Sequence, residues 1–129
     1  MVQWADVDIA GIMYFAAYQC AVERAEMDFF GELGFPYDSV FERYDIWMPR
    51  VHVEADYHKP ALMGDWLTLR THIRQVGASS VKWQTVVHNE RTNEAGAVFH
   101  LTVACMDRRT HKSCPLPAEM RGALLACVG

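Results

Sequence analysis

Two aspartates, Asp6 and Asp8, stand in a short polar segment directly before the expected start of a long helix. The first backbone N–H groups of a helix have no acceptors within the helix, and the helix dipole adds to their positive potential. A carboxylate beside such donors can activate or deliver a nucleophile while the N–H groups stabilise an oxyanion. Together these groups would suffice for acyl transfer from a thioester, because a thiolate leaves without a strong general acid. The same residues could instead only cap the turn or the helix, and residue types alone do not separate the two roles.

Other patterns that carry chemistry are absent from the sequence. It has no Gly-x-Ser-x-Gly nucleophile motif, no His-Glu-x-x-His zinc motif and no Gly-rich phosphate loop between a strand and a helix. The six histidines are scattered and are expected to be solvated residues of strands and loops. The four cysteines form no Cys-x-x-Cys pair, which favours free thiols. No metal site and no cofactor are therefore expected.

Length and composition favour one globular domain over residues 1–129. The chain has 12 Lys and Arg against 16 Asp and Glu, a net charge of -4, so nucleic acid is not an expected partner. No apolar run reaches the roughly 18 residues that a membrane span requires, and the first residues do not resemble a signal peptide. We therefore expect a cytoplasmic protein without a membrane span.

The clearest element in the sequence is a helix. Apolar residues recur at spacings of three and four from Phe15 onward, which predicts one long helix that is buried along one face. Gly34 and Pro36 are expected to end it, since Gly accepts a left-handed cap and Pro cannot continue the helix. Short helices are expected over residues 37–43 and in the tail after Cys114.

The rest of the chain has the alternating pattern of β-strands. A short strand is expected over residues 2–4, and four longer strands follow, joined by short turns into an antiparallel meander. The longer strands correspond to MPRVHVEADYH, WLTLRTHIRQV, VKWQTVVHNE and AVFHLTVACMD. Five strands and one long helix predict an α+β fold.

The final strands are apolar on both sides, which predicts a second surface in need of cover. Phe99 and Leu101 share one face, while Val98, Ala104 and Met106 share the other. One helix can cover only one face of a sheet, so the other face would be covered by a second copy of the chain or by the C-terminal helix. We therefore expect a homodimer or homotetramer.

The stretch WADVDIAGIMYFAAYQCAVERA resembles the signature of hotdog-fold acyl-CoA thioesterases of the 4-hydroxybenzoyl-CoA thioesterase type. The similarity continues through YHKPALMGDWLTLRTHIRQVGASSVKWQTVV and HLTVACMDRRTHKSCPLPAEMRGAL, and so spans nearly the whole chain. It implies a five-stranded antiparallel sheet, in the order 1-3-5-4-2, wrapped around the long helix, with subunits joined edge to edge. It also implies hydrolysis of an acyl-CoA thioester to a carboxylic acid and free CoA, without a cofactor.

The resemblance assigns roles to the residues around the aspartates. The second aspartate of the family's turn is the catalytic carboxylate, which here is Asp8, acting as general base or as nucleophile. The N–H group that polarises the thioester carbonyl would belong to Phe15, with Gly11 and Tyr14 shaping the turn. Many members carry His where Phe15 stands, so a mechanism that needs an imidazole at this position does not apply. Asp6 is expected to be structural, because alternate residues of an extended chain point to opposite sides.

Two further sets of residues are implied by the resemblance. Glu23, on the long helix, matches a carboxylate that faces the acyl pocket in some members, although pairing with Arg24 or a backbone group is the alternative role. CoA phosphates would lie near the Gly-x-Ser-Ser turn, which suggests Ser79, Ser80 and Lys82. The serines could equally be turn residues only.

Two other functions stay open at this point. A hotdog hydratase or dehydratase would share the fold and the acyl thioester, but that chemistry generally pairs a carboxylate with a His, and no His lies near Asp8 in the sequence. A non-catalytic acyl-CoA-binding module would be expected to carry a DNA-binding segment, for which 129 residues leave no room. The acyl group is not specified by the sequence, and an acyl-carrier-protein thioester is an alternative to acyl-CoA.

Overall fold

The long helix α1 (Phe15–Glu32) forms the centre of the computed structural model, which describes all 129 residues. Its buried residues are Ala17, Tyr18, Val22, Glu26 and Phe30, which recur at helical spacing as the sequence predicts. The charged Glu26 in this buried stripe was not predicted. The chain leaves the helix at Gly34, whose φ of 97° is the left-handed conformation that glycine accepts without strain. The predicted bounds of this helix are therefore confirmed.

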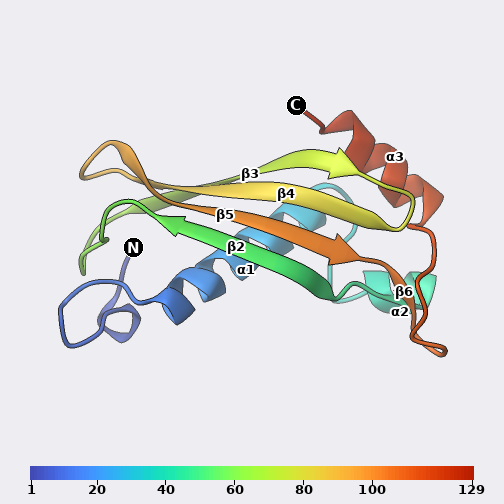
Figure 1. Ribbon diagram of the computed structural model, residues 1–129, viewed down its shortest axis with the longest axis horizontal. Coiled ribbons are helices and arrows are strands. Elements are labelled where there is room, and N and C mark those ends of the chain that lie inside the picture. The colour runs from blue at the N-terminus through green and yellow to red at the C-terminus, as the bar shows by residue number, and fades with distance from the viewer.

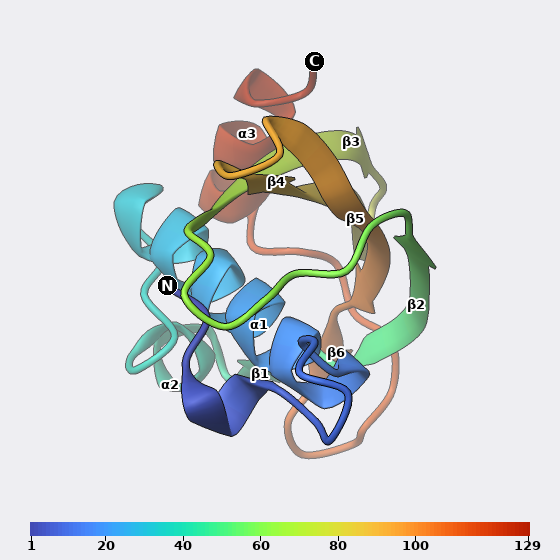
Figure 2. The same ribbon diagram turned by 90° about the vertical axis from the view of Figure 1, so that its left-hand side faces the viewer.

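A curved antiparallel sheet arches over α1, and a pair of very short strands lies near one end of the molecule (Figure 1, Figure 2). The larger sheet contains β2 (Arg50–Tyr57), β3 (Leu67–Val76), β4 (Ser80–Asn89) and β5 (Glu94–Ala104), and the smaller contains β1 (Ile46–Trp47) and β6 (Met106–Asp107). The structure is thus α+β with a helix inside a curved antiparallel sheet, as predicted. The prediction of a single five-stranded sheet is wrong, because the strands form a four-stranded and a two-stranded sheet.

The strand order also differs from the prediction. The larger sheet runs β2-β5-β4-β3, so of the neighbours in the predicted order 1-3-5-4-2 only β4 and β5 remain side by side. The turns from β3 to β4 and from β4 to β5 are short, and they force these strands to be neighbours. The longer connection after β2 lets that strand pair with the far edge of β5 instead of beginning a meander.

No strand forms at the N-terminus. Val2 exchanges two backbone hydrogen bonds of 2.8 Å with Gly64 and Asp65, but the chain then turns into the 3₁₀ helix η1 (Trp4–Asp6). The Asp6 carboxylate accepts the Gln3 N–H at 2.9 Å, which stabilises the turn in place of an extended strand. The N-terminal segment therefore lies beside α1 and the start of β3 without forming a strand.

Two short helices complete the fold. Helix α2 (Val40–Tyr44) lies within one to three residues of the predicted bounds, and α3 (Ala118–Ala126) is the expected C-terminal helix. Met120 and Leu124 of α3 are fully buried and pack beside β3. None of the helices is long and apolar enough to cross a membrane.

The predicted second apolar face is largely absent. Phe99, Leu101 and Val103 are buried against α1, whereas the outward side of β5 alternates Val98 with His100 and Thr102. Val98 pairs with Val86 at the centre of the outer face, and Gln84 pairs with His100 next to it. Met106 lies in β6, outside this sheet. The outer face is therefore mostly polar, and the prediction of a second apolar face of the sheet is wrong.

Candidate active site

Asp8 lies in a tight turn that leads into α1. Its N–H donates to the carbonyl of Ile12 at 3.0 Å, and the N–H of Gly11 donates to the Asp8 carbonyl at 2.9 Å. Gly11 has a φ of 76°, so the turn depends on a left-handed residue at this position. Oδ1 of Asp8 accepts the Ala10 N–H at 2.8 Å, while Oδ2 has no hydrogen-bond partner. The carboxylate is exposed, fixed through one oxygen and open at the other.

The start of α1 presents unpaired backbone donors close to this turn. Tyr14 is the N-cap residue and has no side-chain cap, and the first bonds of the helix run from Ala17 and Tyr18 to the Tyr14 carbonyl. The N–H groups of Phe15 and Ala16 therefore have no acceptor. Unpaired donors at the positive end of a long helix are suited to a developing negative charge.

A pocket of about 370 Å³ adjoins the start of the helix. It is lined by Ile12, Met13, Phe15, Tyr18, Tyr57, His58, Lys59 and Pro60. Its floor is aromatic, because the Tyr18 and Tyr57 rings meet edge to face with centroids 5.3 Å apart. Burial is the main cause that raises the pKa of both tyrosines, so both phenols are neutral at pH 7. We call this space the helix-start pocket.

The helix-start pocket contains two residues that the sequence did not single out. His58 and Lys59 follow β2, and the N–H of His58 donates to the Gly96 carbonyl at 2.8 Å, which holds this segment against β5. Lys59 forms an ion pair with Glu94. The tertiary fold brings them beside Phe15, and no local pattern in the sequence signals that proximity.

Glu23 belongs to a different space. It lines a cleft of about 180 Å³ between α1 and β2 together with Gln19, Arg50 and apolar residues. The rings of Tyr18, Tyr57 and Phe99 form one cluster with centroids 5.3 to 6.2 Å apart, and this cluster separates the cleft from the helix-start pocket. Phe15 and Glu23 are eight positions apart on the helix, which corresponds to roughly 12 Å. Glu23 has no ion pair with Arg24, because adjacent residues of a helix do not face each other. Arg50, which lines the same cleft, pairs with Glu26.

Ser79, Ser80 and Lys82 lie at the opposite end of the molecule from the Asp8 turn (Figure 1). The Gly77 N–H donates to the Ser80 carbonyl at 2.8 Å, and the Cys105 N–H donates to the Ser79 carbonyl at 2.8 Å. The backbone of both serines thus belongs to the hydrogen-bonded turn between β3 and β4. One chain alone does not bring them to Asp8.

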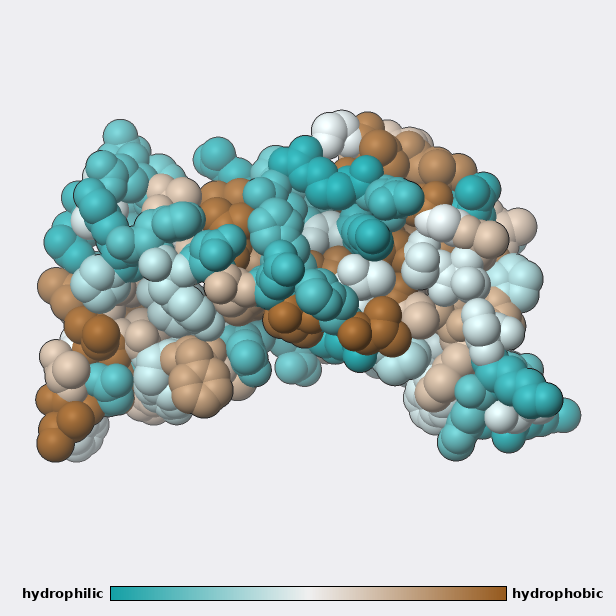
Figure 3. Space-filling model, in the orientation of Figure 1, coloured by the Kyte–Doolittle hydropathy of each residue, from teal (hydrophilic) through white to brown (hydrophobic).

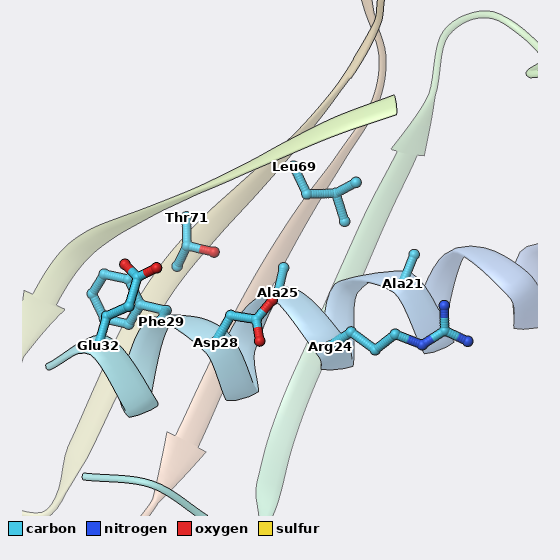
Figure 4. Close-up of a pocket in the computed structure, with 8 residues that line it drawn as sticks. All are labelled: Ala21, Arg24, Ala25, Asp28, Phe29, Glu32, Leu69 and Thr71. Atoms are coloured by element: carbon cyan, nitrogen blue, oxygen red, sulfur yellow. The ribbon is translucent and has the colours of Figure 1, made fainter. Parts of the chain in front are cut away.

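The largest pocket, of about 430 Å³, lies on the other flank of α1 (Figure 4). Arg24, Asp28 and Glu32 project from the helix along its rim, and Leu69 and Thr71 face it from β3. None of the predicted site residues lines it, so its size does not make it the active site.

Hydrophobic side chains gather at the end of the molecule that carries the Asp8 turn (lower left in Figure 3). Trp4, Ile9 and Phe15 are exposed there, Phe15 to 66%. Exposed apolar groups of this size next to unpaired helix donors are typical of a surface that binds a ligand or a partner.

The family to which the chain belongs follows from its similarity to known proteins. Residues 2–124 match the model of the thioesterase-like superfamily. The chain belongs to this superfamily. The acyl-CoA thioester hydrolase YbgC of Escherichia coli is 32% identical over 123 residues, which cover 92% of this chain and 87% of that protein.

Two other thioester hydrolases are similar to the chain over most of its length. The 1,4-dihydroxy-2-naphthoyl-CoA hydrolase of Synechococcus elongatus is 27% identical over 123 residues, covering 94% of this chain and 88% of that protein. The structure of the gentisyl-coenzyme A thioesterase BH1999 superposes with a TM-score of 0.84 at 26% identity, over 96% of this chain and 95% of that one. The prediction of a hotdog thioesterase is thereby confirmed, and the protein is a thioester hydrolase.

Proposed function

We propose that this thioesterase hydrolyses acyl-CoA thioesters with Asp8 as the catalytic carboxylate and the Phe15 N–H as the oxyanion donor. The observation that carries the proposal is the unpaired start of α1 at the rim of an apolar pocket, next to a carboxylate with one free oxygen. Gly11 and Tyr14 have positioning roles, since they set the turn and begin the helix.

The chemistry needs few groups. The thioester carbonyl oxygen would accept hydrogen bonds from the Phe15 and Ala16 N–H groups, which polarises the carbonyl carbon. Oδ2 of Asp8 would take a proton from water as the water oxygen bonds to that carbon, or would itself attack to form a mixed anhydride. In either route the C–S bond breaks, and the thiolate leaves and is protonated. In the second route water then cleaves the mixed anhydride and restores the Asp8 carboxylate, so that both routes give a carboxylic acid and free CoA.

For the acyl group we propose an aromatic ring. The helix-start pocket is lined by Tyr18 and Tyr57, and Phe99 packs behind them, so a flat ring could stack where a straight chain would leave the aromatic faces uncovered. Two of the related proteins are named for aromatic acyl groups, naphthoyl and gentisyl. Glu23, beyond the ring cluster, would contact only the far end of a longer acyl group.

We propose that the protein works as a homodimer. β2 is an edge strand of the sheet, and its Val51 and Val53 side chains are 60% and 45% exposed. Antiparallel pairing of two β2 edges would cover these side chains and place the far end of one protomer beside Asp8 of the other. Ser79, Ser80 and Lys82 could then meet the CoA phosphates, which they cannot do within one chain. Assembly into a homotetramer and a cytoplasmic location remain predictions from the sequence.

A hydratase or dehydratase is the second candidate, and one observation favours it. His58 lines the same pocket as Phe15, so an imidazole lies at the start of α1 that the sequence did not predict. That reaction would add or remove water across a carbon–carbon double bond and would release no thiol. No feature of the fold favours a non-catalytic acyl-CoA-binding module.

A thiol-release assay tests the proposal. The panel contains aroyl-CoA, straight-chain acyl-CoA and 2-enoyl-CoA substrates, with the corresponding acyl-carrier-protein thioesters. We expect thiol release, fastest with an aroyl-CoA. Loss of the enoyl absorbance without thiol release would favour the hydratase, and binding without any turnover would overturn the catalytic proposal.

A further inference from the structure

Cys105 and Cys114 face each other where the chain leaves β5. Met106 pairs with Ser113 in an antiparallel bridge, and the Cys114 N–H donates to the Cys105 carbonyl at 3.0 Å, so the two cysteines are directly opposite. Opposed residues of a hydrogen-bonded antiparallel pair have Cα atoms roughly 5.5 Å apart. A disulfide bridges Cα separations of roughly 4.4 to 6.8 Å. Their Sγ atoms are 3.6 Å apart, so little movement separates the thiol pair from a disulfide.

The two thiols differ in exposure. Cys105 is completely buried, and its Sγ also contacts the Pro115 carbonyl at 3.6 Å, whereas Cys114 is partly exposed. Burial, followed by the neighbouring Cys114, raises the pKa of Cys105 to about 12. Cys114 is therefore the thiol that a reagent in solution meets first. Cys20 and Cys127 are exposed and have no cysteine partner, which makes them internal controls.

We propose that Cys105 and Cys114 are a modification site at which an oxidant of the peroxide class forms an intrachain disulfide. The Cys114 sulfur attacks the peroxide, the O–O bond breaks, and a sulfenic acid and water are formed. The Cys105 sulfur then attacks the Cys114 sulfur as the S–O bond breaks, and the Cys105 proton leaves with the hydroxide as a second water. Two thiols are thus oxidised to one disulfide while one hydrogen peroxide is reduced to two waters.

The disulfide would close the loop over residues 106–113 and attach the segment before α3 to the end of β5. This loop carries the cationic residues Arg108, Arg109 and Lys112 close together. In the reduced protein it is held by the bridge between Met106 and Ser113 and by ion pairs of both arginines with Asp45. A covalent link there restricts the unfolded chain and should raise the melting temperature. It lies at the opposite end of the molecule from Asp8, next to Ser79, whose carbonyl accepts the Cys105 N–H.

The experiment uses the full-length Cys20→Ser/Cys127→Ser protein, so that only the proposed pair can react. Treatment with a small molar excess of hydrogen peroxide should lower the intact mass by two hydrogen atoms and remove both titratable thiols. Peptide mapping should then link Cys105 to Cys114. The melting temperature should rise by several degrees and return after reduction with dithiothreitol.

The matched variant adds Cys114→Ser. This substitution changes the partly exposed cysteine and keeps the buried Cys105. It should show neither the mass loss nor the rise in melting temperature. Retention of both thiols in the Cys20→Ser/Cys127→Ser protein, oxidation of Cys114 only to a sulfinic or sulfonic acid, or a disulfide between two chains would overturn the proposal. The second variant carries Cys105→Ala. A disulfide that Cys114 still forms in this variant would also overturn the proposal.

Discussion

Replacement of Asp8 by Asn separates a catalytic carboxylate from a structural cap. Oδ1 of Asp8 accepts one hydrogen bond, from the Ala10 N–H at 2.8 Å, and an amide oxygen can accept the same bond. The side chain is exposed, so the change leaves no buried group unpaired. The turn around Gly11 should persist, and the loss in stability should stay below about 0.5 kcal/mol.

The expected loss of activity is much larger. The substitution removes the free basic oxygen, and a positioned acid–base group typically contributes roughly 10²- to 10⁴-fold in rate. Each tenfold loss corresponds to about 1.4 kcal/mol of activation free energy, so the barrier should rise by about 3 to 5 kcal/mol. The fall should appear in kcat, with KM nearly unchanged, because the apolar lining of the helix-start pocket is untouched.

The assay is thiol release on the best substrate of the panel, with the melting temperature measured on the same preparations. Asp6→Asn is the matched control, since that carboxylate accepts the Gln3 N–H at 2.9 Å and serves the turn of η1. Its rate should stay within a few-fold of the unaltered protein. Thiol release by Asp8→Asn within the same range would refute the assignment, and Glu23 in the neighbouring cleft would become the next carboxylate to test.

The remaining predictions concern stability, metal dependence and assembly. Arg91 is the main cause that holds the pKa of the buried Asp65 carboxyl well below its usual range. The folded pKa is the lower one, so this stabilisation is present above pH of about 4 and is lost as the pH falls further, and Asp65→Asn should cost about 1 to 3 kcal/mol of unfolding free energy. Acid titration of both proteins by circular dichroism should give a smaller acid-dependent loss for Asp65→Asn, and an identical loss would contradict this role. Treatment with EDTA should leave thiol release unchanged, whereas a loss restored by added zinc would refute metal-free hydrolysis. Val53→Lys on the β2 edge should convert a dimer into monomers in sedimentation velocity and lower turnover, while unchanged sedimentation would place the dimer interface elsewhere.

Local patterns predicted the elements well. The helix from Phe15 follows from apolar residues at a spacing of three and four, and Gly34 ends it in a left-handed conformation, as its residue type suggests. The hairpin between β4 and β5 follows from its turn residues, among them Asn93 with a φ of 54°. These features depend on interactions between residues close in sequence, and such interactions are visible in the sequence itself.

The order of the strands was not predictable in the same way. β2 alternates apolar and polar residues like the other strands, but nothing in that alternation specifies β5 as its partner. The N-terminal strand was wrong for a local reason, since the bond from the Gln3 N–H to Asp6 stabilises a turn that apolar residues alone would not indicate. The prediction of a second apolar face was wrong because the polar residues His100 and Thr102 alternate with the apolar residues on the outer side of β5.

The candidate site was predictable only where it is continuous in sequence. Asp8, Gly11 and Phe15 belong to one turn and the helix start that follows it, so their proximity could be predicted from the sequence. His58 and Lys59 reach the same pocket through the pairing of β2 with β5, which the sequence did not predict. Ser79 and Ser80 lie at the end of the molecule opposite Asp8, so contact between these serines and the CoA phosphates depends on a second protomer.

The most direct test of the account is a crystal structure with a non-hydrolysable acyl-CoA analogue in which a ketone replaces the thioester. We expect the ketone oxygen roughly 2.7 to 3.1 Å from the Phe15 nitrogen, with Oδ2 of Asp8 facing the carbonyl carbon and the acyl ring against Tyr18 and Tyr57. An analogue bound instead in the pocket between α1 and β3, or with its carbonyl turned away from the start of α1, would contradict the proposed site.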